Sequence, residues 1–383
     1  MPRAPGKVRP RVGALVGVLC ASAALASACG QVLGLDAIDY DPGDGATGSP
    51  DAGTPTDAPA DAPADAPAGT QDGDAPSLAD GPVTIAQSPP GTGAVQGVAV
   101  DDKRVYWVTG GQNGSVLSVL KGGGGLKTIA TLQPSPLDIA VLGTNVYWSV
   151  VPGGVGPQCM AMVASTSGNP GPSCVTSSTD DTVRMTLGGG GIVLLAQGTG
   201  ANVNNEYIGF ATPGSMYTNV ETNGVSQAVA ASEQEAMLGN RSDYHVDDVA
   251  LPGLTYGPIL CMTNCGTAAS VDMTLDVSAA NILWITANGG VYEAPILPAA
   301  GSAGTLLAEL PAGTFQRMAR DASYAYVTGL GTSVFAVPLA PAADGGAFLT
   351  LASGENQPSG IAVDESAVYW GTASGAIRMT SLP

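Results

Sequence analysis

The most regular feature of the chain is a short alternation of apolar and polar residues that ends in an aromatic pair. The clearest copies read G-V-A-V-D-D-K-R-V-Y-W-V at 97–108 and G-I-A-V-D-E-S-A-V-Y-W-G at 360–371. Both copies place an Asp five residues before the Tyr and six before the Trp, so they share one register. Alternation broken by an Asp-led turn predicts two successive β-strands in each copy.

Five further copies lie between these two, three of them clear and two worn. The clear copies are D-I-A-V-L-G-T-N-V-Y-W-S at 138–149, M-T-L-D-V-S-A-A-N-I-L-W-I at 273–285 and M-A-R-D-A-S-Y-A-Y-V at 318–327. The worn copies are M-T-L-G-G-G-G-I-V-L-L-A at 185–196 and A-V-A-A-S-E-Q-E-A-M-L-G at 228–239. The positions equivalent to the Trp are then 107, 148, 194, 238, 284, 327 and 370. Their spacing of about 44 residues is typical of a four-stranded propeller blade.

The ends of the repeat region predict how the array closes. The first unit contains four expected strands, at 97–100, 104–108, 115–120 and 126–132. The last unit stops after its third strand at 376–381, whereas the domain opens with an orphan strand, P-V-T-I-A-Q at 82–87. We therefore predict an all-β, seven-bladed β-propeller over 81–383, in which the N-terminal strand completes the last blade and removes the exposed sheet edges.

The V-Y-W pattern with its preceding Asp resembles the YWTD and NHL propeller families over residues 82–383. Those families often have six blades, so six or eight blades are the alternatives to seven. Their second Asp after the aromatic pair is absent here, where Val108-Thr109, Ser149-Val150 and Gly371-Thr372 stand. The resemblance thus implies the repeat architecture and carries over no ligand site.

The first 28 residues have the order of an export signal. Four basic residues at 3–11 precede an uncharged small and apolar stretch at 12–28, which is shorter than the ~20 residues of a membrane-spanning helix. The stretch ends in Ala26-Ser27-Ala28-Cys29-Gly30, which resembles the lipobox of bacterial lipoproteins, with Ala26 in place of the preferred Leu. The resemblance implies lipidation of Cys29, and a cleaved secretory signal with an incidental Cys29 is the alternative.

We predict from their composition that residues 29–80 form a disordered linker between the lipidated Cys29 and the propeller. From Asp36 to Asp80 the chain is nearly all Asp, Ala, Pro, Gly and Thr, with eleven Asp and no basic residue. Such a segment cannot bury enough apolar area to offset the entropy of ordering it. The order of a signal, a lipidated Cys and an acidic spacer before a globular domain resembles that of surface lipoproteins of large-genome bacteria.

The charge balance excludes nucleic acid as a partner. The chain carries 13 Lys and Arg against 32 Asp and Glu, and four of the basic residues lie in the signal segment. Clustered Lys and Arg supply most of the affinity for phosphate backbones. The abundance of Gly (54) and Pro (29) suits many short strands joined by tight turns.

Four Asp residues occupy the same place in four units and have two interpretations. As a partial carboxylate ring, they would hold a cation such as calcium near the channel. As turn residues, each would accept hydrogen bonds from backbone N–H groups two residues on, which we favour. The four are Asp101, Asp276, Asp321 and Asp364. The aromatic pairs lie mid-strand, and we expect one member of each to pack between blades rather than to stack on a ligand.

Four cysteines remain once Cys20 leaves with the signal and Cys29 is lipidated. In an exported protein, an even number of cysteines suggests disulfides. Proximity within a unit favours Cys159 with Cys174 and Cys261 with Cys265, although four cysteines allow three pairings. A metal site at the C-x-x-x-C spacing is the weaker alternative.

His245 is the one imidazole in the sequence, so acid–base or nucleophilic chemistry of the Ser-His type would have to use it. The G-x-S-x-G elbow and the phosphate-binding loops are absent from the sequence. We expect a monomeric cell-envelope protein, periplasmic or cell-surface, that needs no cofactor and binds a protein or glycan through its loops, above all at 149–158 and 196–206. The alternative is a lactonase- or lyase-like propeller enzyme that uses His245 or a channel-bound calcium.

Overall fold

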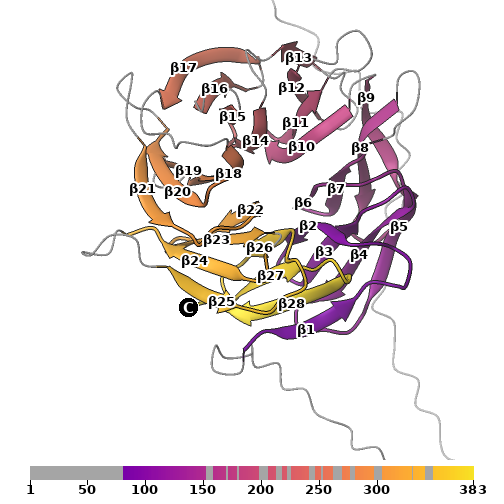
Figure 1. The fold of residues 1–383 in the computed structure, drawn as a ribbon. Coiled ribbons are helices and arrows are strands. Elements are labelled where there is room, and N and C mark those ends of the chain that lie inside the picture. Colours follow the sequence, from indigo (N-terminus) through magenta and orange to yellow (C-terminus); the bar gives the residue numbers. More distant parts are fainter. Residues whose placement is uncertain are drawn as a thin grey trace, which may run out of the picture. The chain divides into compact units, whose positions relative to one another are not determined.

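The computed structural model describes the repeat region as a ring of antiparallel sheets (Figure 1). The described residues are 81–383 apart from 152–157, 170, 179–180, 198–205, 213–217, 222–225, 241–245, 252, 262–269, 277–280, 297–303, 330 and 341–347. The export signal, Cys29 and the linker at 29–80 therefore lie outside the described residues. Among the described residues, no helix meets the length and hydropathy that a bilayer crossing requires.

Seven four-stranded sheets form the blades, which confirms the predicted number. Blade one comprises β2 (Val95–Val100), β3 (Arg104–Thr109), β4 (Gly114–Leu120) and β5 (Lys127–Gln133). Blade two comprises β6 (Ile139–Leu142), β7 (Asn145–Ser149), β8 (Gln158–Ser165) and β9 (Ser173–Ser178). Blade three comprises β10 (Asp181–Gly188), β11 (Gly191–Gln197), β12 (Glu206–Ala211) and β13 (Thr218–Glu221).

The remaining blades repeat the same order of strands. Blade four comprises β14 (Ser226–Ala231), β15 (Glu235–Asn240), β16 (Val246–Ala250) and β17 (Thr255–Cys261). Blade five comprises β18 (Ser270–Asp276), β19 (Asn281–Thr286), β20 (Gly290–Pro295) and β21 (Thr305–Glu309). Blade six comprises β22 (Phe315–Arg320), β23 (Tyr324–Gly329), β24 (Val334–Pro338) and β25 (Leu349–Ala352). Blade seven comprises β26 (Ile361–Val363), β27 (Ala367–Gly371), β28 (Ala376–Ser381) and β1 (Val83–Gln87).

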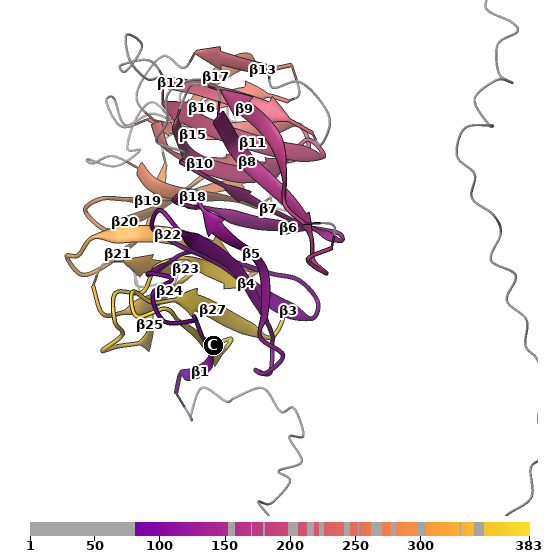
Figure 2. The ribbon, with the colours of Figure 1, turned by 90° about the vertical axis from the view of Figure 1, so that its right-hand side faces the viewer.

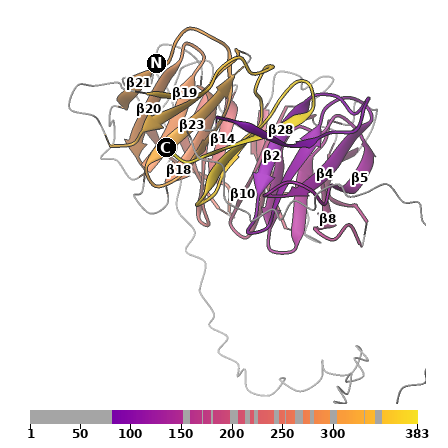
Figure 3. The ribbon, with the colours of Figure 1, turned by 90° about the horizontal axis from the view of Figure 1, so that it is seen from below.

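Strand β1 closes the ring, as the orphan strand predicts. It pairs antiparallel with β28, from Val83 opposite Met379 to Gln87 opposite Ala376. Arg378 ties the two strands, because its guanidinium donates to the Thr84 hydroxyl at 2.8 Å and to the Pro82 carbonyl at 3.1 Å. Figure 3 shows the yellow β28 close to β2 of the first blade.

Strand pairing confirms the register of all seven units, including the two worn ones. Met185 lies opposite Leu194 and Val229 opposite Leu238, just as Val98 lies opposite Trp107. The worn units have therefore lost their aromatic residues but have kept the alternation that places one face of each strand inside. Hydrophobic pattern, rather than aromatic identity, sets the register of these blades.

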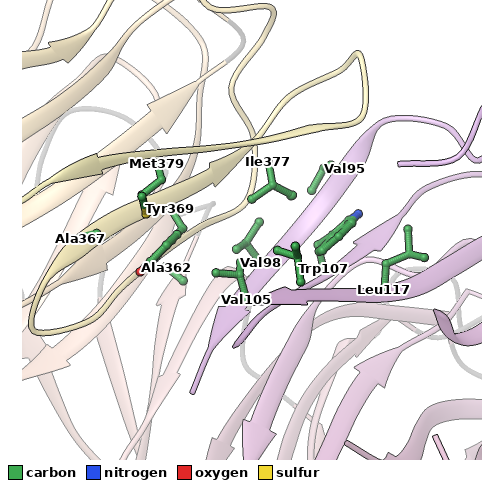
Figure 4. Close-up of a cluster of buried hydrophobic side chains, with 11 residues drawn as sticks. Val95, Val98, Val105, Trp107, Leu117, Ala362, Ala367, Tyr369, Ile377 and Met379 are labelled. Carbon is green, nitrogen blue, oxygen red and sulfur yellow. The ribbon is translucent and has the colours of Figure 1, made fainter. Parts of the chain in front are cut away.

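The hydrophobic core is divided among the interfaces between neighbouring blades. Seven clusters of buried side chains are described, each built from two successive blades. The cluster where the ring closes unites Val98 and Trp107 of blade one with Tyr369 and Met379 of blade seven (Figure 4). Figure 2 shows the strands of blade one beside those of blade two.

Both members of each aromatic pair pack between blades, where we expected only one. Trp107 faces blade seven, whereas Tyr106 packs on the opposite side against Ile139 and Trp148 of blade two. This follows from the pleat, because successive side chains of a strand point to opposite faces and each face of a blade meets a neighbour. The pair therefore stabilises two interfaces at once.

The buried indole N–H groups bond to the preceding blade. Trp107 donates to the Ser88 hydroxyl at 2.9 Å, Trp148 to Gln133 at 3.0 Å and Trp370 to Glu355 at 3.3 Å. Each acceptor ends or follows the outermost strand of the blade before. A buried donor without a partner costs free energy, so these hydrogen bonds stabilise the contact between successive blades.

We predict that closure by β1 stabilises the whole ring. A chain beginning at Pro89 leaves β28 as an open edge and removes the partner of the Trp107 indole, so it should lose at least about 2 kcal/mol of unfolding free energy and aggregate. Thermal unfolding followed by circular dichroism measures the loss. A chain beginning at Gly81, which keeps β1, is the matched control, and equal stability of the two truncated chains would contradict the prediction.

Candidate functional site

The innermost strands of all seven blades line a cavity of about 200 Å³ at the centre of the ring. These strands are β2, β6, β10, β14, β18, β22 and β26. The lining residues lie near the start of some strands and in the middle of others, such as Arg184 to Thr186 in β10 and Asp272 to Thr274 in β18. The cavity therefore lies on the axis of the ring, between the inner strands.

A ring of equivalent positions places charged side chains around this cavity. In each inner strand, one residue lies opposite the Trp or its equivalent on the next strand, as Val98 lies opposite Trp107. We call the residue immediately before it the ring position. Its occupants, in blade order, are Gly97, Asp138, Arg184, Ala228, Asp272, Arg317 and Gly360. In five blades a β-bulge lies immediately before this position, and bulges bend a strand and redirect its side chains.

The two Asp residues of the ring each bond to the next blade. Asp138 accepts a hydrogen bond from the backbone N–H of Met185 at 2.8 Å, and Asp272 accepts one from Met318 at 2.6 Å. The inner strands are sheet edges, so their outward N–H groups have no partner strand. The two carboxylates satisfy one such N–H in blade three and one in blade six.

One ion pair crosses the ring from blade six to blade two. The Arg317 guanidinium donates to Asp138 at 2.6 Å, and both side chains are largely buried. Blades seven and one lie between them, and there the ring position is glycine. A Cβ on Gly360 would approach the Gly97 backbone to 2.7 Å, so the close contact of these blades requires glycine. The missing side chains leave room for Arg317 to reach Asp138.

Burial and mutual proximity shift the pKa values of the other two ring charges. Burial raises the pKa of Asp272 above its usual value, although the nearby Arg317 and Arg184 counteract this. Burial, together with the neighbouring charge of Arg317, lowers the pKa of Arg184. The four charges balance in sign, so the cavity can hold a polar group by hydrogen bonds and charge without carrying a strong net field.

The repeat Asp residues lie at turns away from this ring. Asp101 accepts hydrogen bonds from the backbone N–H groups of Lys103 and Arg104 at 2.8 and 2.7 Å, and its second oxygen accepts one from the Tyr106 hydroxyl at 2.7 Å. Asp321 and Asp364 make the equivalent bonds, to Tyr326 and Tyr369. The contacts of Asp101, Asp321 and Asp364 agree with the interpretation of these residues as turn residues. The structure does not describe the side chain of Asp276.

Two of the turn carboxylates, Asp101 and Asp364, have a lowered pKa because of their hydrogen-bond and charge partners. Burial raises the pKa of Asp101, but the hydrogen bonds from Lys103, Tyr106 and Arg104 outweigh it and leave the pKa below its usual value. In Asp364 the Lys121 ammonium, at 2.7 Å, contributes to the same net lowering of the pKa and links blade one to blade seven. The described residues contain no group of three or more His, Cys, Asp or Glu side chains arranged to hold a metal.

The structure pairs two of the four predicted cysteines. Cys159 and Cys174 form a disulfide between the neighbouring strands β8 and β9, with Cα atoms 5.8 Å apart. Cys261 ends β17, but its side chain is not described, and Cys265 lies outside the described residues. His245 and most of the predicted binding loops 149–158 and 196–206 also lie outside them.

The charged ring is the feature that sequence reasoning missed. Three of the repeat units begin at Met185, Met273 and Met318, one residue after the charged ring position, whereas the unit at 138–149 begins with Asp138 itself. The signal that could have found it is a charged residue directly before the inner-strand motif in four units. Nothing in the local pattern shows that these four positions meet, because Asp138 and Arg317 are 179 residues apart.

Solved structures with the same fold include enzymes and binding proteins. A catalytically inactive variant of virginiamycin B lyase from Staphylococcus aureus with quinupristin matches with a TM-score of 0.61 and 11% identity, covering 79% of this chain and 99% of that chain. YCF48 bound to D1 peptide matches with a TM-score of 0.57 and 12% identity, covering 79% and 96%. The computationally designed Ika8 protein matches with a TM-score of 0.54 and 12% identity, covering 78% and 99%.

These likenesses establish the β-propeller fold and nothing finer. No protein-family model matches the chain, and no curated protein matches it. The resemblance of the repeat to YWTD and NHL propellers therefore stays an expectation. The class that fold and site define is a seven-bladed β-propeller with a charged central cavity.

A further buried carboxylate, away from the ring, lies in blade four. Asp248 of β16 is 8% exposed, and its Oδ1 has no hydrogen-bond partner. Burial and the nearby charge of Glu235 raise its pKa from 3.8 to about 6. The ionised form is therefore disfavoured in the folded chain, which costs stability at neutral pH.

We predict that Asp248 makes the folded chain less stable as the pH rises from about 4 to about 6, since the folded state then binds more protons than the unfolded state. Asp248→Asn should raise the unfolding free energy at pH 7 by on the order of 1–2 kcal/mol and reduce the difference between pH 5 and pH 7. Denaturant unfolding at both pH values measures this. Asp102→Asn, at an exposed carboxylate, is the control, and an unchanged pH dependence in Asp248→Asn would contradict the prediction.

Proposed function

We propose that this chain is the precursor of a bacterial lipoprotein, anchored in the cell envelope outside the cytoplasm by a lipid on Cys29. Residues 1–28 are the signal peptide, 29–80 the linker and 81–383 the propeller. The lipobox-like Ala26-Ser27-Ala28-Cys29 supports the anchor. The Cys159–Cys174 disulfide supports the location, because disulfides form and persist in oxidising compartments.

The propeller acts as a binding module for a protein ligand rather than as an enzyme. The observation that carries this proposal is the charged ring, whose Asp and Arg side chains form fixed hydrogen bonds at the cavity. Arg keeps its proton and serves to hold groups rather than to transfer protons. The likeness to YCF48 bound to D1 peptide favours a protein over a glycan, although both chemistries suit such a face.

The competing function is a lactonase- or lyase-like enzyme that uses His245 or a calcium held by channel carboxylates. The observation that favours it is the likeness to virginiamycin B lyase. The ring carboxylates already accept hydrogen bonds from backbone N–H groups and from Arg317, so a calcium there would have to displace Arg317 from Asp138. We therefore keep this function as the alternative.

Lipidation at Cys29 is tested by metabolic labelling with a fatty acid in a bacterial host. Cys29→Ala should abolish the label and move the chain from the membrane fraction to the soluble fraction, because the acceptor thiol is lost. Cys20→Ala is the matched control, since that residue leaves with the signal peptide. Label retained in Cys29→Ala would contradict the proposal.

The choice between binding and catalysis is tested on the mature chain. Binding predicts that the chain captures a defined envelope protein by cross-linking, whereas the linker alone at 29–80 captures none. It also predicts no turnover of a lactone panel or of quinupristin. Turnover that His245→Ala abolishes, in a chain that still unfolds cooperatively, would overturn the binding proposal in favour of the enzyme.

A further inference from the structure

We propose that blade four binds a hard divalent cation, Ca²⁺ or Mg²⁺, between the carboxylates of Asp248 and Glu235. The two residues lie on β16 and β15, and neither of them lines the central cavity. The inference goes beyond the proposed binding function, because the ion stabilises its blade whatever ligand the propeller binds.

The carboxylate of Asp248 is buried and incompletely paired. The residue is 8% exposed, and its Oδ1 accepts no hydrogen bond from the part of the chain that the structure describes. The neighbouring side-chain charge that acts on it is negative, that of Glu235. A buried oxygen without a donor costs free energy, and two adjacent carboxylates repel each other. A positive ion bound between them removes both costs.

The strand register makes Asp248 and Glu235 diagonal neighbours on one face of the blade. Asp248 lies opposite Met237, whereas Glu235 precedes Met237 by two residues and lies opposite Ala250. Side chains two residues apart on a strand point to the same face, and diagonal partners across an antiparallel pair are within reach of long side chains. The two carboxylates can therefore share one ion.

The same diagonal pair joins an acceptor to a donor in two other blades. In blade one, Arg104 at the start of β3 donates from its Nε to the Ser118 hydroxyl at 3.0 Å. In blade five, Asn281 at the start of β19 donates from its amide to the Glu293 carboxylate at 2.6 Å. Blade four keeps an acceptor at this place but has Glu235 where the donor stands in the other two. The missing positive partner can then be supplied from solution.

The surroundings and the charge of the pair favour a small divalent ion. Met237 stands where blade one has Tyr106, so the aromatic ring and hydroxyl that occupy this place in blade one are missing beside Asp248. Two ionised carboxylates carry two negative charges, which a single divalent ion neutralises. Ca²⁺ and Mg²⁺ both prefer carboxylate oxygens, and water supplies the ligands that two carboxylates leave open.

The test uses the purified mature chain, freed of metal with a chelator and titrated with CaCl₂ or MgCl₂ in a calorimeter. We expect one ion per chain with a Kd on the order of 10⁻⁴–10⁻³ M, and an unfolding midpoint that rises with ion concentration. Methylammonium and methylguanidinium at equal ionic strength should do neither. Binding of these monovalent cations in place of the metals, or no heat of binding up to about 10 mM metal, would overturn the inference.

Asp248→Asn and Glu235→Gln each remove one charge and should weaken metal binding about tenfold or more, because affinity follows the number of charged ligands. Glu233→Gln, at an exposed carboxylate of the same blade, is the matched control and should bind as the unaltered chain does. Without metal, Asp248→Asn is the more stable chain, so Ca²⁺ should narrow that difference by stabilising only the unaltered chain. Equal binding in Asp248→Asn would sink the inference.

Glu235→Arg tests the comparison with blade one directly. It places a guanidinium at position 235, as Arg104 does in blade one, so the variant should lose the metal and unfold at a higher temperature than the unaltered metal-free chain. Metal binding that persists in this variant would count against the site. Capture of an envelope protein tests the proposed function and does not depend on this ion, so the two failures are distinguishable.

Discussion

Closure of the ring by β1 is the constraint on which the rest of the structure depends. An array of seven sheets that stayed open would leave two blade faces exposed, with Trp107 and Tyr369 among the apolar side chains in water. Pairing of β1 with β28 instead brings blade seven against blade one and buries these side chains in one cluster. Gly360 permits that approach, because a Cβ there would come within 2.7 Å of the backbone of Gly97 and Val98 in blade one.

Closure also creates the central site. The seven inner strands reach the axis only when the ring is complete, and only then do their first residues face one another. The ring position is occupied by Gly, Ala, Asp or Arg in different blades, whereas the Trp position and its apolar equivalents stay buried in every blade. Packing between blades restricts which residues can stand at the blade interfaces, whereas the residues at the axis can differ from blade to blade.

The Asp residues of the chain divide by position into structural and candidate functional groups. Those that open the turn between the first two strands of a blade have their oxygens filled by neighbouring N–H groups and a Tyr hydroxyl, so they stabilise the blade they belong to. Those at the ring connect one blade to the next, because each accepts a backbone N–H from the following inner strand. Asp thus stabilises the turn that follows the inner strand, and it also lines the central cavity at the ring position.

The sequence alone determined the blade number, the register and the closing strand, because alternation, turn residues and a missing fourth strand are local signals that repeat at a fixed period. It also predicted the turn bonds of Asp101, Asp321 and Asp364 and the favoured partner of Cys159, since these contacts join residues close in the chain. The tertiary structure decided that both aromatic residues of a pair pack between blades and that Asp138, Arg184, Asp272 and Arg317 share one cavity. Those contacts depend on rotation about a common axis, and no property of a single repeat encodes which residues meet there.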